Sequence, residues 1–161
     1  NSIAYCALSP RADEDLFIEF CEDFEYTPVI FHAYQTVNGQ RELIYHTNVM
    51  MAVTQKYIIA CLDAIDDKKE RKNFIAHAVI SGKEIINISE EQVEHFVGNM
   101  LQVLDANNKP ITVMSQAAYD SLSPDQLQLL EKEATILSSD LSTIETCGGG
   151  SARCMMAEVF L

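Results

Sequence analysis

The feature with the clearest chemical potential is a cysteine that follows a run of glycines near the C-terminal end. Gly148, Gly149 and Gly150 come shortly before Cys154. Glycines carry no side chains, so the backbone around Gly149 can approach a substrate closely and present amide groups to it. A thiolate is an effective nucleophile, so the motif predicts a catalytic cysteine at Cys154. The alternative is a glycine turn that leads into a strand with a buried, inert cysteine.

His46 is the second candidate for chemistry. It lies at the start of an apolar stretch, after Leu43-Ile44-Tyr45. An imidazole titrates near neutral pH, so it can protonate a leaving amine and later deprotonate water. A histidine in an apolar strand can equally be a hydrogen-bonded core residue. His32, His77 and His95 have contexts that fit packing or a solvated helix face, and no spacing predicts a metal site.

Cysteine usage and charge limit the classes of function. The five cysteines form no CxxC pair, and Cys6, Cys21 and Cys61 lie in apolar segments, so we expect free thiols and a cytoplasmic location. The formal net charge of −13 argues against a nucleic-acid partner or an anionic membrane surface. No cofactor motif is present, and the expected partner is a small-molecule substrate. A homo-oligomer is possible.

The elements that must position these residues form an α/β pattern. Short apolar runs predict strands at 3–8, 28–33, 43–53, 57–62, 84–88, 98–104, 110–115, 135–138 and 152–160. Apolar spacing and capping residues predict helices at 13–24, 66–81 and 123–134. The first helix is expected to bury one face, formed by Leu16, Phe17, Phe20, Cys21 and Phe24. Ser89-Glu90-Glu91-Gln92 is a further capping box that predicts a short helical turn.

The order of these elements repeats along the chain. Two strands, a helix and a strand run from 43 to 88, and a similar set runs from 98 to 138. His46, Asn99 and the glycine loop open successive units at intervals of roughly 50 residues. The pattern predicts an array of ββαβ units in which strand 152–160 completes a unit begun elsewhere. A plain α/β sandwich with accidental spacing is the alternative.

Four motifs, in order, resemble the arginine deiminase and amidinotransferase superfamily. The stretch 148–158 resembles its C-terminal nucleophile motif, and 45–51 its catalytic histidine strand. Ser9-Pro10-Arg11 looks like its Ser-x-Arg substrate segment, and Gly98-Asn99 like its recurring Gly-Asn strand. Together they look closest to the amidinotransferase-like citrulline-utilisation hydrolases.

This resemblance implies the pentein fold, a five-bladed α/β propeller of ββαβ units. Residues 1–161 would be the C-terminal part of one such domain, about three blades of five, with an N-terminal half as partner. The resemblance also implies that Cys154 attacks the central carbon of a guanidino or ureido group and that His46 is the general acid and base. Arg11 would bind a substrate carboxylate, for which a guanidinium fork is well shaped.

One position departs from the deiminase pattern. Deiminases carry Asp two residues after the histidine, where this chain has Asn48. A neutral amide suits a neutral ureido group better than a cation, which favours citrulline over arginine as substrate. The alternatives are an amidinotransferase, in which an amine replaces water, and a non-catalytic binding protein on the same fold. Cys154 and His46 argue against the latter.

Overall fold

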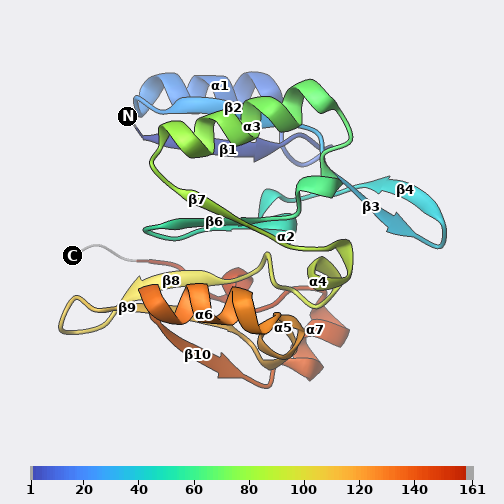
Figure 1. Ribbon diagram of the computed structural model, residues 1–161. Helices are drawn as coiled ribbons and strands as arrows, with labels where there is room; N and C mark the ends of the chain where they lie inside the picture. Colours follow the sequence, from blue (N-terminus) through green and yellow to red (C-terminus); the bar gives the residue numbers. More distant parts are fainter. Residues whose placement is uncertain (1, 159–161) are drawn as a thin grey trace.

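The computed structural model describes residues 2–158, which form a mixed α/β structure (Figure 1). The strands are β1 (Ile3–Ala7), β2 (Thr27–Phe31), β3 (Tyr34–Val37), β4 (Gln40–Leu43), β5 (Met51–Val53), β6 (Tyr57–Ala60), β7 (Glu84–Asn87), β8 (Leu101–Leu104), β9 (Pro110–Ser115) and β10 (Thr135–Ser139). The helices are α1 (Glu14–Asp23), α2 (Thr47–Met50), α3 (Lys68–Ile80), α4 (Glu90–Glu94), α5 (Gln116–Ser121), α6 (Pro124–Glu133) and α7 (Ser142–Gly148). Two 3₁₀ turns are η1 (Leu62–Ala64) and η2 (Arg153–Met155).

Two sheets share one topology, as the sequence repeat predicts. In the sheet β5-β6-β7, the first pair is antiparallel and the second is parallel, with α3 between β6 and β7 in the chain. In the sheet β8-β9-β10, the pairing is the same, with α5 and α6 before β10. The parallel pair β1-β2, connected by α1, is the partial unit. In Figure 1 the three sheets follow one another from the N-terminal to the C-terminal part of the chain.

Capping residues and apolar runs explain where these elements form. Asp13 caps α1 by accepting from the Leu16 amide at 3.1 Å, and Ser89 and Ser123 form complete capping boxes at α4 and α6. Strand β6 is buried along its whole length because it lies between β5 and β7. The capping box at Ser89 confirms the predicted helical turn, which is the short helix α4.

The core lies between the sheets and their helices. Phe74 of α3 is fully buried, and its ring lies 5.1 Å from the ring of Tyr5 and 5.3 Å from that of Phe31, centroid to centroid. Helix α3 therefore packs against both β2 and β7, and joins the first unit to the second. The loops between strands and helices are held in place by this packing, and they carry the residues of the site.

The structure corrects three expectations about elements. The strand 43–53 is interrupted by α2, and the described residues of 152–160 form the turn η2 instead of a strand, while 159–161 lie outside the described part. The hairpin β3-β4 and helices α5 and α7 were not predicted. The predicted buried face of α1 is also wrong: Cys21 is buried, but Leu16 and Phe24 are 66% and 62% exposed. Nothing in the described chain covers that side of the helix.

Candidate active site

All five residues predicted for the site line one cavity of about 550 Å³. The cavity is formed where the loop after β1, helix α2, helix α4 and the loop after α7 meet. Its lining includes Arg11, His46, Asn48, Gly149 and Cys154, and also Gln35, Tyr45, Val49, Val93, Glu94, Phe96, Asn99, Gly148 and Gly150. His46 and Cys154 are far apart in the sequence, and only the fold brings them to the same cavity.

Cys154 is exposed to this cavity, and its sulfur is held by a buried asparagine. Asn99 is 3% exposed, and its Nδ2 donates to Cys154 Sγ at 3.1 Å. The Asn99 carboxamide oxygen accepts from the backbone N–H of Cys154 at 3.4 Å. Cys154 lies in the turn η2, where its amide also donates to the Ser151 carbonyl at 3.1 Å. The position of Cys154 is therefore fixed by a turn and one side chain.

The glycine loop determines how closely the backbone approaches the sulfur. Gly149 has a φ of 66° and ends α7 in the left-handed conformation, donating its N–H to the Glu145 carbonyl. A Cβ at Gly150 would lie 3.2 Å from Cys154 Cβ and 3.3 Å from its Sγ. Ser151 is fully buried and donates to Glu145 at 2.6 Å, which ties the loop to α7. The glycines are needed for both the turn and the space around Cys154.

His46 and Arg11 are positioned by Tyr45. His46 precedes the first residue of α2, and its ring lies edge-on to the ring of Tyr45 at 4.9 Å. The guanidinium carbon of Arg11 lies 5.1 Å from the centroid of the same tyrosine ring. Ser9 donates its hydroxyl to the Tyr45 carbonyl at 2.8 Å and accepts from the Arg11 amide. The Ser-x-Arg segment is thus attached to the histidine segment.

Asn48 also lies near the sulfur. Its Nδ2 is 3.9 Å from Cys154 Sγ, and its Oδ1 is buried without a hydrogen-bond partner among the described residues. The Asn48 backbone carbonyl accepts from Asn99 Nδ2 at 3.1 Å. Asn48 is therefore close to the sulfur, and its side-chain oxygen is the one group there without a hydrogen-bond partner among the described residues.

The structure adds residues that were not named as site residues from the sequence. The sequence named Asn99 only as part of a Gly-Asn motif and gave it no role in the site. That motif was the one signal in the sequence that could have identified it. Tyr45 adjoins His46 in the sequence, but its contact with Arg11 requires the fold. Glu94 gives the cavity a carboxylate, and it lies on the exposed side of α4. A single sequence offers no pattern that separates Glu94 from a surface helix residue.

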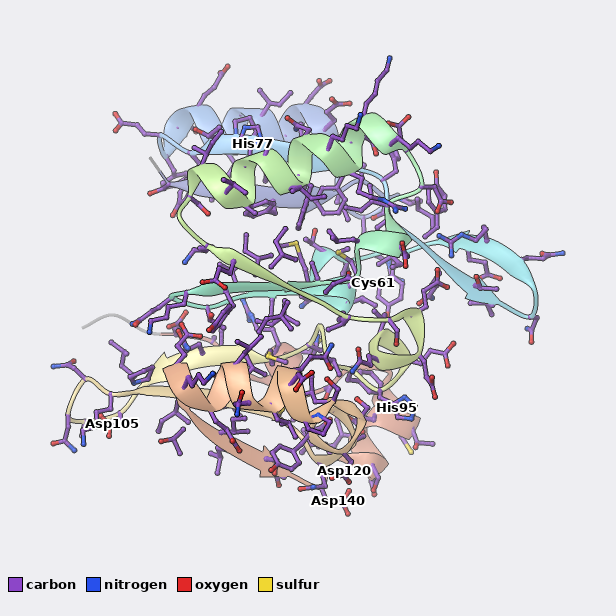
Figure 2. The ribbon with its side chains drawn as sticks, viewed as in Figure 1. Cys61, His77, His95, Asp105, Asp120 and Asp140 are labelled. Atoms are coloured by element: carbon purple, nitrogen blue, oxygen red, sulfur yellow. The ribbon has the colours of Figure 1, made fainter. Side chains whose placement is uncertain are left out.

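The remaining cysteines and histidines are in ordinary environments. Burial raises the pKa of the Cys6, Cys21 and Cys61 thiols, which keeps them protonated at neutral pH. His77 on α3 and His95 at the end of α4, labelled in Figure 2, each hydrogen-bond a carbonyl one turn earlier. His32 contacts Glu70 at 3.0 Å. These histidines have the structural roles that their contexts indicated.

A hollow of about 560 Å³ lies around Glu91, His95 and Asp120, between α4 and α5 (Figure 2), and no cysteine lines it. Across residues 2–158 no group of three or more His, Cys, Asp or Glu side chains is arranged to hold a metal ion. No helix in this part of the chain is long and apolar enough to cross a membrane.

The comparison with protein families decides the assignment. A family model described as N,N dimethylarginine dimethylhydrolase, eukaryotic, matches residues 1–161. The chain belongs to the dimethylarginine dimethylhydrolase family. This membership confirms the superfamily that the four motifs indicated. The narrower placement among citrulline-utilisation hydrolases stays a prediction.

A solved structure supports the same fold. The apo crystal structure of ArgZ, an arginine dihydrolase from the ornithine-ammonia cycle in cyanobacteria, superposes with a TM-score of 0.64 at 17% sequence identity. The match covers 93% of this chain and 21% of the ArgZ chain. This chain therefore spans about a fifth of the length of ArgZ. A search of curated proteins gave no match.

Proposed function

We propose that the protein is a hydrolase that breaks a C–N bond in the guanidino or ureido group of an arginine-like amino acid. The observation that carries the proposal is the single cavity that contains Cys154, His46, Arg11, Asn48 and Gly149. A nucleophile, an acid/base group and a carboxylate-binding cation are the components that this reaction requires. Membership of the dimethylarginine dimethylhydrolase family supports the same class of reaction.

Binding follows from the charges that line the cavity. The Arg11 guanidinium is held against the Tyr45 ring, and it is suited to pair with the α-carboxylate of the substrate. Glu94 is the carboxylate of the cavity, and it is suited to the α-ammonium group or to a substrate guanidinium. Backbone groups at Gly149 would contact the substrate without a side chain in the way.

The chemistry proceeds in two steps at Cys154. The thiolate attacks the central carbon of the guanidino or ureido group, and His46 gives a proton to the amine that leaves. His46 then takes a proton from water, which attacks the same carbon and breaks its bond to sulfur. Citrulline and water would give ornithine, carbon dioxide and ammonia; a dimethylated arginine and water would give citrulline and dimethylamine.

Two substrates have specific support. The neutral Asn48 amide, close to the sulfur, favours the neutral ureido group of citrulline over the cation of arginine. The name of the family favours dimethylarginine. We place citrulline first because the side chain near the sulfur is the neutral Asn48 amide, at the position where deiminases carry Asp.

We also infer that the three units belong to a five-bladed propeller with further blades supplied from outside this chain. The repeated ββαβ order and the likeness to ArgZ support this inference. A closed array packs each blade against two neighbours, so the 161-residue chain alone should be inactive. The absence of any disulfide among the five free cysteines supports a cytoplasmic location.

The test is turnover by the full-length protein with citrulline, arginine and dimethylarginine, measured as the amine released. Cys154→Ala should abolish turnover, and Cys147→Ala is the matched control because it removes the other exposed cysteine. Citrulline as the best substrate supports our order, and dimethylarginine as the best supports the family name. A product that forms only with an added amine acceptor would indicate an amidinotransferase. No turnover of any substrate would indicate a binding protein.

A further inference from the structure

Asn99 makes two hydrogen bonds to Cys154, more than any other side chain in the described part of the chain. Its Nδ2 donates to Cys154 Sγ and to the Asn48 carbonyl, both at 3.1 Å, and its Oδ1 accepts from the Cys154 amide. Its own backbone carbonyl accepts from the Arg153 amide at 3.2 Å. One buried residue therefore joins the cysteine turn to helix α2.

The partners of Asn99 fix the orientation of its carboxamide. The Asn48 carbonyl can only accept a hydrogen bond, and the Cys154 backbone N–H can only donate one. The NH₂ end must therefore face the carbonyl and the sulfur, and the oxygen must face the backbone amide. As a result, Cys154 Sγ receives an N–H donor at 3.1 Å whether it is thiol or thiolate.

An N–H donor directed at sulfur favours the anionic form. A hydrogen bond to a charged group is stronger than one to its neutral form, so the donor stabilises a thiolate more than a thiol. The buried position of Asn99 strengthens this effect, because water does not compete for the amide. The geometry also keeps the sulfur on the cavity side of η2.

We propose that Asn99 is a positioning residue that holds Cys154 Sγ in the cavity and favours its thiolate form; this proposal rests on the proposed function of Cys154. The amide acts through the sulfur, by its hydrogen bond to Sγ. Gly98 is needed for the same arrangement, because only a residue without a side chain lets the Asn99 segment approach α2 this closely.

The experiment measures the rate of Cys154 alkylation by iodoacetamide against pH, in the full-length protein, with peptide mass spectrometry. The variants are Asn99→Ala, which removes the donor, and Asn99→Asp, which replaces it with a carboxylate. Removing a charge-stabilising hydrogen bond should lower the alkylation rate at pH 7 about tenfold. The rate at high pH should stay within about twofold, since accessibility is unchanged. Asn99→Asp should show the larger loss of rate at pH 7.

Asn87→Ala is the matched control, because Asn87 Oδ1 also accepts from a backbone amide, that of Leu62 at 3.1 Å, outside the cavity lining. Its alkylation profile should match the parent protein. The buried cysteines report folding in the same samples, since they are labelled only when the core opens. Folded Asn99 variants with the parent profile would refute the proposal, and so would variants in which every cysteine becomes labelled. Turnover that survives Cys154→Ala would refute the proposed function while leaving the alkylation result valid.

Discussion

Replacing Gly98 with alanine should destabilise the protein by a steric mechanism that the structure specifies. A Cβ at this position would lie 2.4 Å from the Val49 carbonyl oxygen, 2.8 Å from Met50 C and 2.9 Å from Met51 N. All three are backbone atoms of α2 and its C-terminal end, so no side chain can rotate away. Gly98 does not have a positive φ, so the loss of stability would come from steric overlap and not from backbone strain.

The magnitude follows from the size of the overlap. An ordinary contact begins near 3.4 Å, so the helix or the Gly98 segment must move by about 1 Å. Overpacking of this kind costs about 1–3 kcal/mol, and we expect the upper end because backbone must move. About 3 kcal/mol corresponds to a fall in Tm of about 6–12 °C for a domain of this size class. The movement would also separate the Asn48 carbonyl from Asn99.

Thermal unfolding followed by circular dichroism measures this effect. Gly148→Ala is the matched control, because its nearest neighbour would be Ile144 Cγ2 at 4.0 Å and the residue ends helix α7. Alanine is the better helix former, so this variant should be between unchanged and about 1 kcal/mol more stable. A Tm of Gly98→Ala within about 1 °C of the parent protein would refute the steric argument.

Two further predictions concern titratable groups. Brief treatment with iodoacetamide near neutral pH should label Cys154 well before the three buried cysteines, because burial raises the pKa of their thiols. Peptide mapping measures the labelling, and preferential labelling of Cys147 would contradict the assignment. The backbone amides of Glu70 and Lys69 donate to Asp67 at the start of α3 and lower the pKa of its carboxyl group. The contribution of Asp67 to stability is therefore complete above the pKa of the unfolded state, and it is lost as the pH falls through the pKa of the folded state. Asp67→Ala should therefore lower Tm at pH 7, and lower it by less in acid; an equal loss at both pH values would exclude this linkage.

The sequence predicted most of the regular elements because their signals are local. Strand β9 has the predicted bounds, and α6 begins at the capping box that Ser123 and Gln126 form. The prediction failed at 43–53, where apolar residues were interpreted as one strand. Helix α2 forms there because tertiary contacts fix its ends: the Thr47 side chain accepts from the Ala7 amide, and the Cys61 amide donates to the Met50 carbonyl. Such bonds between distant segments leave no local pattern.

The exposed face of α1 shows a second limit of prediction from the sequence. Its spacing of Leu16, Phe20 and Phe24 is that of a buried stripe, and the described chain leaves these side chains in the open. Periodicity reports that a face is apolar, whereas burial depends on whether another element covers it. The sequence therefore specified the helix and its face correctly but not the burial.

For the site, the sequence by itself determined the residue types: a cysteine after glycines, a histidine, an arginine and an asparagine in a fixed order. The tertiary structure decided that Cys154 lies on a turn, that Arg11 packs against Tyr45, and that Asn99 holds the sulfur. Catalytic groups are chosen for their chemistry, which is a property of each residue and can be read from the sequence. Their distances depend on how loops from separate units pack, and that is settled only when the sheets and helices of all the units come together.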